Sequence, residues 1–484
     1  MGKKKFLRHS RAGRRIYRII VTAGLVLAWT VGAHAQPSNL PPSPLSIGQA
    51  IRYGVEHYPS VRASLARVSA AQSGVDLTRT AYLPRLDMGY QANRATFNNV
   101  SGLFFRDPFT LAISGPDLNR QSYTGAWGSA TGALAGWEPF DFGFRSRNVE
   151  TARAAERQAA AGVALTQLDV GLGVGNAFFA VAMASQAVEA MKGNVERRRV
   201  FAETVGVLVK SGLRPGVDLS RTQAELALAR TQLIQAEQAQ DIAQATLAEV
   251  LGVAGTTVAI NANSLLNVPV VNGGLPEPAP WTHPQAIAQL NTAEIFRKRQ
   301  EALDRAWVPK FNLEAGFTAR GSGWDNQGNP AGGATGLGPD VANWAAGLSL
   351  RFALFDFASI RAQRSIERHN EQAERATYDQ VIQALTGKHA KANATVKAAL
   401  KVSENTPVQL SAAQDTELQA LTRYKTGLAT VLEVAEAQQL LVQATIDDAL
   451  ARLGVWRALL GLAGARGNLQ PFLDLARRSI EKGP

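Results

Sequence analysis

Histidine and cysteine supply most catalytic nucleophiles, proton carriers and metal ligands, and this sequence of 484 residues offers few of them. It contains no cysteine, which excludes a thiolate metal site, a cysteine nucleophile and a lipid anchor on an N-terminal cysteine. After residue 35 the histidines are His57, His283, His369 and His389, in no spacing that suits a metal. Phosphate-binding glycine loops and serine nucleophile motifs are also missing from the sequence. We therefore expect no enzyme activity, no catalytic residue, no cofactor and no bound metal.

The net charge of +12, from 51 Lys and Arg against 39 Asp and Glu, would suggest a nucleic-acid binder if it were evenly spread. Residues 1–35, however, hold eight basic side chains and no acidic one. An apolar stretch from Ile19 to Val31 follows this basic run, and Ala33-His34-Ala35 completes the pattern of a secretory signal peptide. The remaining chain has 43 basic and 39 acidic residues, a balance of +4. The sequence thus predicts an exported protein and gives little support to nucleic acid as a partner.

The elements that would position any site occur twice, because the chain after the signal peptide is internally duplicated. Residues 82–86 (YLPRL) correspond to residues 307–311 (WVPKF) at an offset of 225, and residues 210–213 (KSGL) to residues 425–428 (KTGL) at an offset of 215. Each half is predicted to contain a helix, two strands, a long helix, a tight turn and a second long helix. The predicted organisation is a signal peptide over 1–35, a first repeat over 36–251, a linker over 252–280, a second repeat over 281–463 and a C-terminal tail over 464–484.

The predicted strands alternate between apolar and polar side chains over about ten residues. In the second half the apolar positions are Phe311, Leu313, Ala315, Phe317 and Ala319, followed by alternate residues from Trp344 to Leu354. In the first half the strands are predicted over 86–93 and 123–138, and long loops over 98–120 and 322–340 join the strands of each pair. This alternation is typical of a transmembrane β-strand, although a half-buried strand of a soluble sheet alternates in the same way.

The helical stretches over 145–211 and 359–426 are each about 67 residues, roughly 100 Å at 1.5 Å per residue. The helices that follow have a heptad seam, which indicates coiled-coil packing. Its positions are Leu219, Thr222, Leu226, Ala229, Leu233, Ala236, Gln240, Ala243, Leu247 and Val250, then Leu432, Ala435, Gln439, Val442, Ile446, Ala449, Leu453, Trp456 and Leu460. Glycines 171, 173 and 175 and Pro407 predict kinks or breaks in the long helices. Asp218 and Thr430 are candidate N-caps of the returning helices.

Four strands per chain cannot close a membrane barrel, because the smallest such barrels have eight strands. If the strands lie in a membrane, several chains must therefore complete the wall, and the sequence favours an oligomer. No uninterrupted apolar run of 18 or more residues follows residue 35, so we expect no transmembrane helix.

This duplicated series of elements resembles the TolC family of outer-membrane efflux proteins over nearly the whole mature chain. The resemblance implies an α+β membrane protein: a homotrimer with a 12-stranded transmembrane β-barrel in outer-membrane lipid, four strands per chain, above a long coiled-coil α-helical barrel in the periplasm. It implies a passive exit duct of a tripartite efflux or export system in a Gram-negative outer membrane. The implied partners are a periplasmic adaptor (membrane fusion) protein and an inner-membrane RND or ABC transporter.

The resemblance is sharpest at residues 424–437, which match the segment that closes the periplasmic tip in this family. It implies that Glu433 and Glu436 form a carboxylate ring at the pore gate, and that Asp218 is linked to Tyr424 at the same gate. At spacing i and i+3 the two carboxylates lie on one helix flank. Ala429 stands where the family has an arginine, so one lock of the closed state is either missing or supplied by Arg214. The turns at Gly212-Leu213 and Gly427-Leu428 match the loops that meet the adaptor, and a plain helix C-cap would have the same residues.

Two alternatives stay open. The chain could be the outer-membrane component of a type I protein-secretion system in place of drug or metal efflux. A soluble periplasmic coiled-coil scaffold would also explain the heptads, but it would not need alternating strands of membrane-spanning length.

Overall fold

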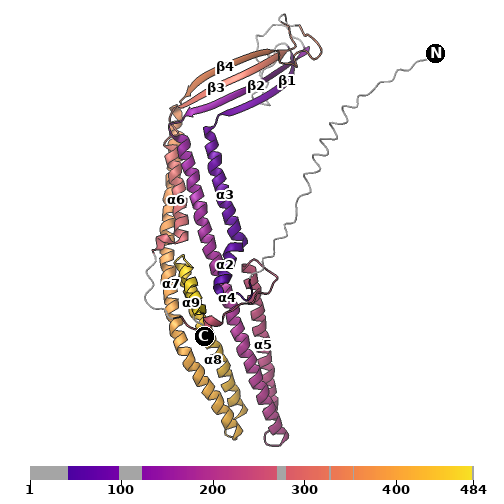
Figure 1. Cartoon of the computed structure of the whole chain (residues 1–484), viewed down its shortest axis with the longest axis vertical. Coiled ribbons are helices and arrows are strands. Elements are labelled where there is room, and N and C mark those ends of the chain that lie inside the picture. The colour runs from indigo at the N-terminus through magenta and orange to yellow at the C-terminus, as the bar shows by residue number, and fades with distance from the viewer. Residues whose placement is uncertain are drawn as a thin grey trace, which may run out of the picture. The chain divides into compact units, whose positions relative to one another are not determined.

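The computed structural model describes residues 42–96, 123–269, 279–325, 327, 329–352 and 354–481. The signal peptide predicted over 1–35 and the loop predicted over 98–120 lie outside these residues. The fold belongs to a compact unit that begins at Ser43. Its helices and strands are α2 (Ile47–His57), α3 (Pro59–Arg79), β1 (Arg85–Thr96), β2 (Gly125–Phe140), α4 (Phe144–Lys210), α5 (Gly216–Val250), α6 (Pro284–Leu303), β3 (Lys310–Ser322), β4 (Val341–Arg351), α7 (Phe357–Lys425), α8 (Val431–Ala465) and α9 (Gln470–Glu481). The strands gather at one end of this unit, and the turns of two long helical hairpins lie at the other (Figure 1).

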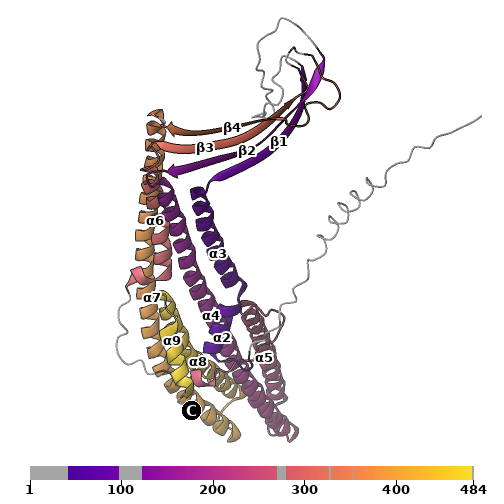
Figure 2. The same ribbon diagram turned by 45° about the horizontal axis from the view of Figure 1, so that its top comes forward.

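The strands form one antiparallel sheet in the order β1-β2-β3-β4, so the two predicted halves meet where β2 pairs with β3. This confirms the two strands predicted in each half. The last strand is shorter than predicted: β4 ends at Arg351, because Leu354–Asp356 form a short 3-10 helix that leads into α7. The strands run side by side and curve away from the helices (Figure 2).

The two long helices have nearly the predicted extent, 67 residues in α4 and 69 in α7. Each pairs with the next helix in a hairpin, α4 with α5 and α7 with α8 (Figure 1). The predicted seam of α5 is confirmed, since all its positions are at least half-buried, whereas Ile234 and Ile242 beside it are exposed. The seam of α8 is buried or half-buried from Ala435 to Leu460 except at Gln439, and Leu432 near the turn is exposed. Long coiled-coil hairpins are therefore the main structural unit of the chain.

The predicted break at the glycines of α4 is wrong, because the helix runs through them without interruption. A Cβ atom on Gly171 would lie 2.5 Å from Leu469 Cδ1, and one on Gly175 would lie 2.5 Å from Leu460 Cδ2. These glycines thus allow neighbouring side chains to approach the helix backbone closely. Pro407 likewise lies inside continuous α7.

The largest hydrophobic core lies where α2, α9 and residues 251–269 pack against α4, α5 and α8. Its fully buried side chains include Phe178, Phe179 and Trp456. The Trp456 ring lies 6.3 Å from that of Phe472 in α9, and its Nε1 donates a hydrogen bond to Asn267 O at 3.0 Å. We call α2, α9 and residues 251–269 the girdle layer. The segment predicted as a C-terminal tail over 464–484 thus contains the end of α8 and a helix that packs on the core.

The predicted boundary between the two halves has no counterpart in the packing. The halves share the sheet through β2 and β3, and α4 of the first half contacts α6 and α8 of the second. The domain limits therefore stay a prediction that describes the sequence duplication.

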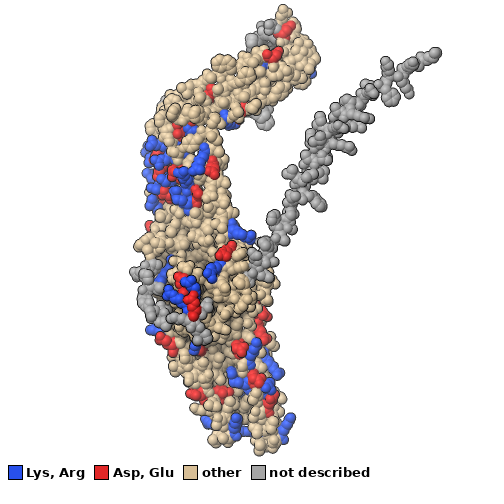
Figure 3. Space-filling view, in the orientation of Figure 1, with Lys and Arg blue, Asp and Glu red and all other residues tan. Residues whose placement is uncertain are grey.

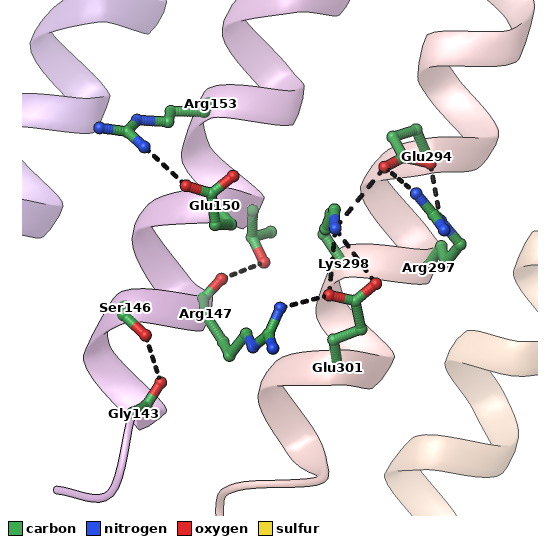
Figure 4. Close-up of polar contacts among 10 residues, drawn as sticks. Gly143, Ser146, Arg147, Glu150, Arg153, Glu294, Arg297, Lys298 and Glu301 are labelled. Atoms are coloured by element: carbon green, nitrogen blue, oxygen red, sulfur yellow. Dashed lines mark hydrogen bonds and ion pairs between the residues drawn. The ribbon is translucent and has the colours of Figure 1, made fainter.

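Near the sheet, α4 and α6 are joined by charged side chains (Figure 4). Arg147 Nη1 lies 2.9 Å from Glu301 Oε2, and Lys298 Nζ lies 3.0 Å from the same oxygen. These side chains are partly exposed, so each pair contributes at most about 1 kcal/mol to stability. Their main effect is to fix the lateral contact of the two helices below the strands.

One described helix, α4, contains a window long and apolar enough to cross a membrane by length and composition. Half of that window is buried inside the chain. The buried part includes Phe178 and Phe179 in the core under the girdle layer, which is the environment of a core helix.

Candidate functional site

The hairpin turns at the end remote from the sheet hold the predicted tip residues. Gly212 and Gly427 have φ angles of +69° and +80°, the left-handed conformation in which glycine is favoured over residues with a Cβ atom. Leu213 N donates to Leu208 O at 2.9 Å, and Leu428 N donates to Arg423 O at 2.8 Å, so both turns satisfy the last helical carbonyls. Leu213 and Leu428 are left 70% and 71% exposed. Each turn therefore presents one large apolar side chain to its surroundings.

Tyr424, at the end of α7, is the buried centre of the tip. Its ring is 1% exposed and packs edge-on against Phe201 of α4, with 5.1 Å between ring centroids. On the other side the guanidinium of Arg214 lies 4.6 Å from the Tyr424 ring centroid, and Arg214 Nη2 donates to Tyr424 O at 2.9 Å. Arg214 belongs to the α4–α5 turn, so this contact fastens one hairpin to the other within a single chain.

Asp218 lies close enough to Tyr424 to act on it electrostatically. Burial raises the pKa of Tyr424, Arg214 opposes this rise, and Asp218 adds to it. The structure therefore brings together the predicted pair of Asp218 and Tyr424, with Arg214 as a third member. The prediction that Asp218 caps α5 is wrong, because the N-cap is Pro215 and Asp218 lies in the first helical turn.

Glu433 has a structural task that the sequence analysis missed. Its Oε1 accepts hydrogen bonds from Thr430 N at 3.0 Å and Thr430 Oγ1 at 3.1 Å, and Thr430 Oγ1 accepts from Glu433 N at 3.3 Å. This is a capping box at the start of α8, and it confirms Thr430 as the N-cap. The hydrogen bonds from Thr430 hold the pKa of Glu433 below its usual value, so the side chain is anionic at neutral pH.

Glu436 is exposed one turn further along α8, as is Glu433. Both carboxylates thus lie on the surface of a single chain, where a ring of charges could form only with further copies. Ala429, in the position of the missing arginine, is buried in the small core around Tyr424.

The sheet carries the second candidate surface. Antiparallel partners project from the same face, and the pairs Leu313–Leu348 and Phe317–Trp344 place large apolar side chains together. On β1 the corresponding positions include Met88, which pairs with Ala133 and is 80% exposed. Other large apolar residues of this face are similarly exposed: Leu86, Tyr90, Leu313, Phe317, Trp344, Leu348 and Leu350.

The opposite face of the sheet is mostly polar or small, with Leu134 and Val341 as large apolar exceptions. It includes Asp87 and Gln91 on β1, Gly132 on β2, and Glu314 and Thr318 on β3. A sheet with one largely exposed apolar face and one mostly polar face fits an environment that is lipid on one side and water on the other.

Two buried arginines were not predicted, because each contacts a backbone carbonyl far away in the sequence, Ala435 O for Arg198 and Ala81 O for Arg145. Arg198 of α4 is 5% exposed, pairs with Glu225 of α5 at 2.6 Å and reaches Ala435 O of α8 at 3.4 Å. Arg145 pairs with Asp141 at 3.0 Å and donates to Ala81 O at 2.9 Å. Arg198 thus links α4, α5 and α8, and Arg145 links the start of α4 to the chain segment before β1.

His283 has a structural role. His283 Nδ1 accepts a hydrogen bond from Gln285 N at 3.1 Å and its Nε2 lies 3.2 Å from Gly464 O, so it caps α6 and contacts the end of α8. Among the described residues, no group of three or more His, Asp or Glu side chains could hold a metal ion.

Comparison with protein families decides the class of this chain. The family model described as "Outer membrane efflux protein" matches residues 55–253 and 286–468, which include both hairpins and all four strands. The chain belongs to this family.

Known members and structures agree with this assignment. The efflux protein is 28% identical over 447 residues to Protein CyaE of Bordetella pertussis, a match that covers 91% of this chain and 86% of the relative. Its fold is similar to that of the outer membrane protein VceC of Vibrio cholerae, with a TM-score of 0.67, 17% identity, and coverage of 87% of this chain and 96% of VceC. It is also similar to the open state of the MtrE outer membrane channel of Neisseria gonorrhoeae, with a TM-score of 0.66, 17% identity, and coverage of 87% of this chain and 89% of MtrE.

These matches confirm the predicted family, the predicted fold of long helices with a four-stranded sheet, and the function as an outer-membrane efflux channel protein. The family and the fold are those of channel proteins and not of enzymes. Two exposed surfaces distinguish this chain, an apolar sheet face and a tip made of two turns.

Proposed function

We propose that three copies of this chain form a passive duct through which an inner-membrane transporter exports its substrates across the periplasm and the outer membrane. In this assembly β4 of one copy pairs with β1 of the next, and three four-stranded sheets make a 12-stranded barrel. The hairpins continue the wall into the periplasm.

The exposed apolar face of the sheet carries the proposal. Side chains such as Met88 and Trp344 are 80% and 81% exposed, and leaving a row of them in water would be costly, at roughly 25 cal/mol per Å² of apolar surface. Lipid removes that cost. The outer strands β1 and β4 each have an unpaired edge within the described sheet, and a membrane tolerates such edges only if they pair with another strand.

At the tip, we propose that Leu213 and Leu428 with their glycines meet a periplasmic adaptor, because they are exposed apolar side chains on well-defined turns. Glu433 and Glu436 would line the closed pore when the threefold axis gathers them from each copy. A ring of carboxylates attracts cations. Arg214 would help to keep the tip closed by holding Tyr424. The inner-membrane partner would be an RND or ABC transporter, and export of a protein by a type I secretion system remains the second candidate.

Extraction and native mass measurement test the assembly. The protein should leave membranes only in detergent and give a mass of three chains with bound lipid. A soluble periplasmic scaffold would leave in buffer without detergent. That result, or a monomer that stays monodisperse in detergent, would contradict the proposal.

A further inference from the structure

A groove of about 660 Å³ lies between α4, α7 and α8, beneath the start of α6. Its floor is apolar and includes Leu168 and Leu172 of α4 and Ala458 of α8. Its volume is within the range of sites that hold small organic molecules. Its lining also includes His283, Gln285 and Gly464, which are joined by the contacts described above, and its other lining residues have no role in those contacts.

The groove is bordered by basic side chains. Lys388 and Lys391 of α7 and Arg457 of α8 line it, and Asp169 is the only acidic side chain among its lining residues. Both lysine side chains are exposed, and Arg457 donates from Nε to Asn176 Oδ1 at 3.2 Å. These cations are thus available to a ligand.

The same charge pattern extends along the helix. Between Asp379 and Glu404, α7 carries Lys388, Lys391, Lys397 and Lys401 and no acidic residue. By contrast, the charged network near the sheet pairs most of its basic side chains with glutamates, and Figure 3 shows blue and red side by side there. The middle of α7 thus carries an excess of positive charge that the network near the sheet does not have.

The groove lies on the face of α8 that points away from the girdle layer. At 3.6 residues per turn, Gly461 and Ala465 are about half a turn from Trp456, which is buried against α9 and Asn267. If three copies close into a duct, a layer as thick as α2, α9 and residues 251–269 would block the bore from inside. The layer must then lie outside, and the groove faces the interior.

We propose that this groove is an anion-selective site inside the duct, which transiently holds exported molecules with a carboxylate, sulfate or phosphate group and an apolar body. The anionic group is bound by Lys388, Lys391 and Arg457, and the apolar body lies along Leu168 and Leu172. This inference rests on the proposed function, since the groove must open into the bore. It adds a substrate preference that a plain water-filled duct lacks.

Single-channel recording in bilayers of phosphatidylcholine alone tests the site, because such bilayers contain no anionic lipid that could occupy it. Octyl sulfate, added to the side of the sheet loops, should produce transient current blocks. Inorganic sulfate and octyltrimethylammonium should not, because one lacks the apolar body and the other has the wrong charge. Equal blocking by inorganic sulfate would show that charge alone acts and would overturn the proposed class of ligand.

Paired variants show which lysines cause the current block by octyl sulfate. Lys388→Gln with Lys391→Gln should shorten the octyl sulfate blocks roughly fivefold, as expected from the loss of two exposed charge contacts. Lys397→Gln with Lys401→Gln removes the same charge from the same helix and should leave the blocks unchanged. Gly454→Leu with Gly461→Leu should also weaken blocking, because no atom lies within 4 Å of a Cβ at either glycine and the new side chains would fill the groove.

Because the chain has no cysteine, single introduced cysteines can test whether the groove opens into the bore of the duct. An anionic thiol reagent applied to Thr395→Cys, at the groove, should change the conductance, whereas on Arg477→Cys, in α9, it should not. No effect at Thr395→Cys, or identical blocks in both lysine pairs, would overturn the site. A wild-type protein that forms no channel at all would instead contradict the proposed function.

Discussion

The guanidinium of Arg214 lies 4.6 Å from the centroid of the Tyr424 ring and donates a hydrogen bond to the Tyr424 carbonyl oxygen at 2.9 Å. The two residues are 210 positions apart and belong to different hairpins. One side chain in the first turn thus holds the last helical residues of α7 in place. An arginine at position 429 is not needed for this contact, and Ala429 instead fills the small core beneath it.

Replacing Arg214 should loosen the tip. We expect Arg214→Ala to raise the open fraction of the channel roughly two- to fivefold per chain, because a cation–π contact at such a site is worth about 0.5–1 kcal/mol. Single-channel recording measures this fraction. Arg221→Ala, on the exposed side of α5, is the matched control and should behave as wild type. An unchanged open fraction in Arg214→Ala would show that the contact does not restrain the tip.

At the partner residue, the ring matters more than the hydroxyl. The buried Tyr424 hydroxyl has no hydrogen-bond partner among the described residues, so Tyr424→Phe should keep the closed state. Tyr424→Ala removes a fully buried ring and should open the tip and increase protease cleavage near it. If Tyr424→Phe opened the channel as much as Tyr424→Ala, a hydroxyl contact between copies would have to replace the intrachain explanation.

The carboxylates at the start of α8 should set ion selectivity. Glu433→Gln with Glu436→Gln should lower the preference for cations and weaken block by divalent cations. Glutamine at position 433 still accepts the capping hydrogen bonds, so the thermal stability should change little. Glu433→Ala with Glu436→Ala should lose selectivity and also destabilise the helix start, by about 1 kcal/mol. Reversal potentials in a salt gradient measure the selectivity, and an unchanged value in both double variants would remove these residues from the pore.

His283 should make stability depend on pH. Burial lowers its pKa in the folded chain, with a further decrease from Lys388 and opposing effects of Gly464 O and Asp169. The contribution of neutral His283 to the free energy of unfolding is thus fully present above the unfolded pKa of about 6.5. It declines as the pH falls below that value, because the unfolded chain then binds a proton that the folded chain does not. The difference in melting temperature between wild type and His283→Asn should shrink or reverse from pH 7.5 to pH 5. A constant difference would show that His283 titrates alike in both states.

The glycines of α4 differ in their surroundings, and two substitutions should therefore have opposite effects. Gly175→Ala places a Cβ 2.5 Å from Leu460 Cδ2 and should destabilise the core under the girdle layer. Gly173→Ala meets no atom within 4 Å and should stabilise the helix by up to about 1 kcal/mol. Thermal unfolding in detergent distinguishes them, and a loss of stability in Gly173→Ala would contradict the packing described here.

The strands and hairpins could be predicted because their periods are visible in the sequence. Alternation at Phe311–Ala319 and the heptads from Leu219 each depend on residues within one element. The girdle layer could not be predicted, since α9 acquires its role only by packing Phe472 against Trp456. The glycines were misread for the same reason: the partner of Gly175 is Leu460, in the other half of the chain.

At the tip, the glycine turns could be predicted because Gly212 and Gly427 follow directly from helix C-cap chemistry. The capping box is also visible in the sequence, as Thr430 followed three residues later by Glu433. No local sequence pattern predicts the contact between Arg214 and Tyr424, because the two residues are 210 positions apart. It depends on two turns that come together only after both hairpins have formed.

Cross-linking of the sheet edges tests the central claim of a closed assembly of three chains most directly. Because the chain has no cysteine, pairs can be introduced without background, one on β1 at Met88 and one on β4 at Trp344, Ala346 or Leu348. Oxidation should produce covalent dimers and trimers for at least one pair and no larger species, since a ring of three has no free edge. Chains that remain monomeric with every pair, or a ladder that continues beyond three, would contradict the account.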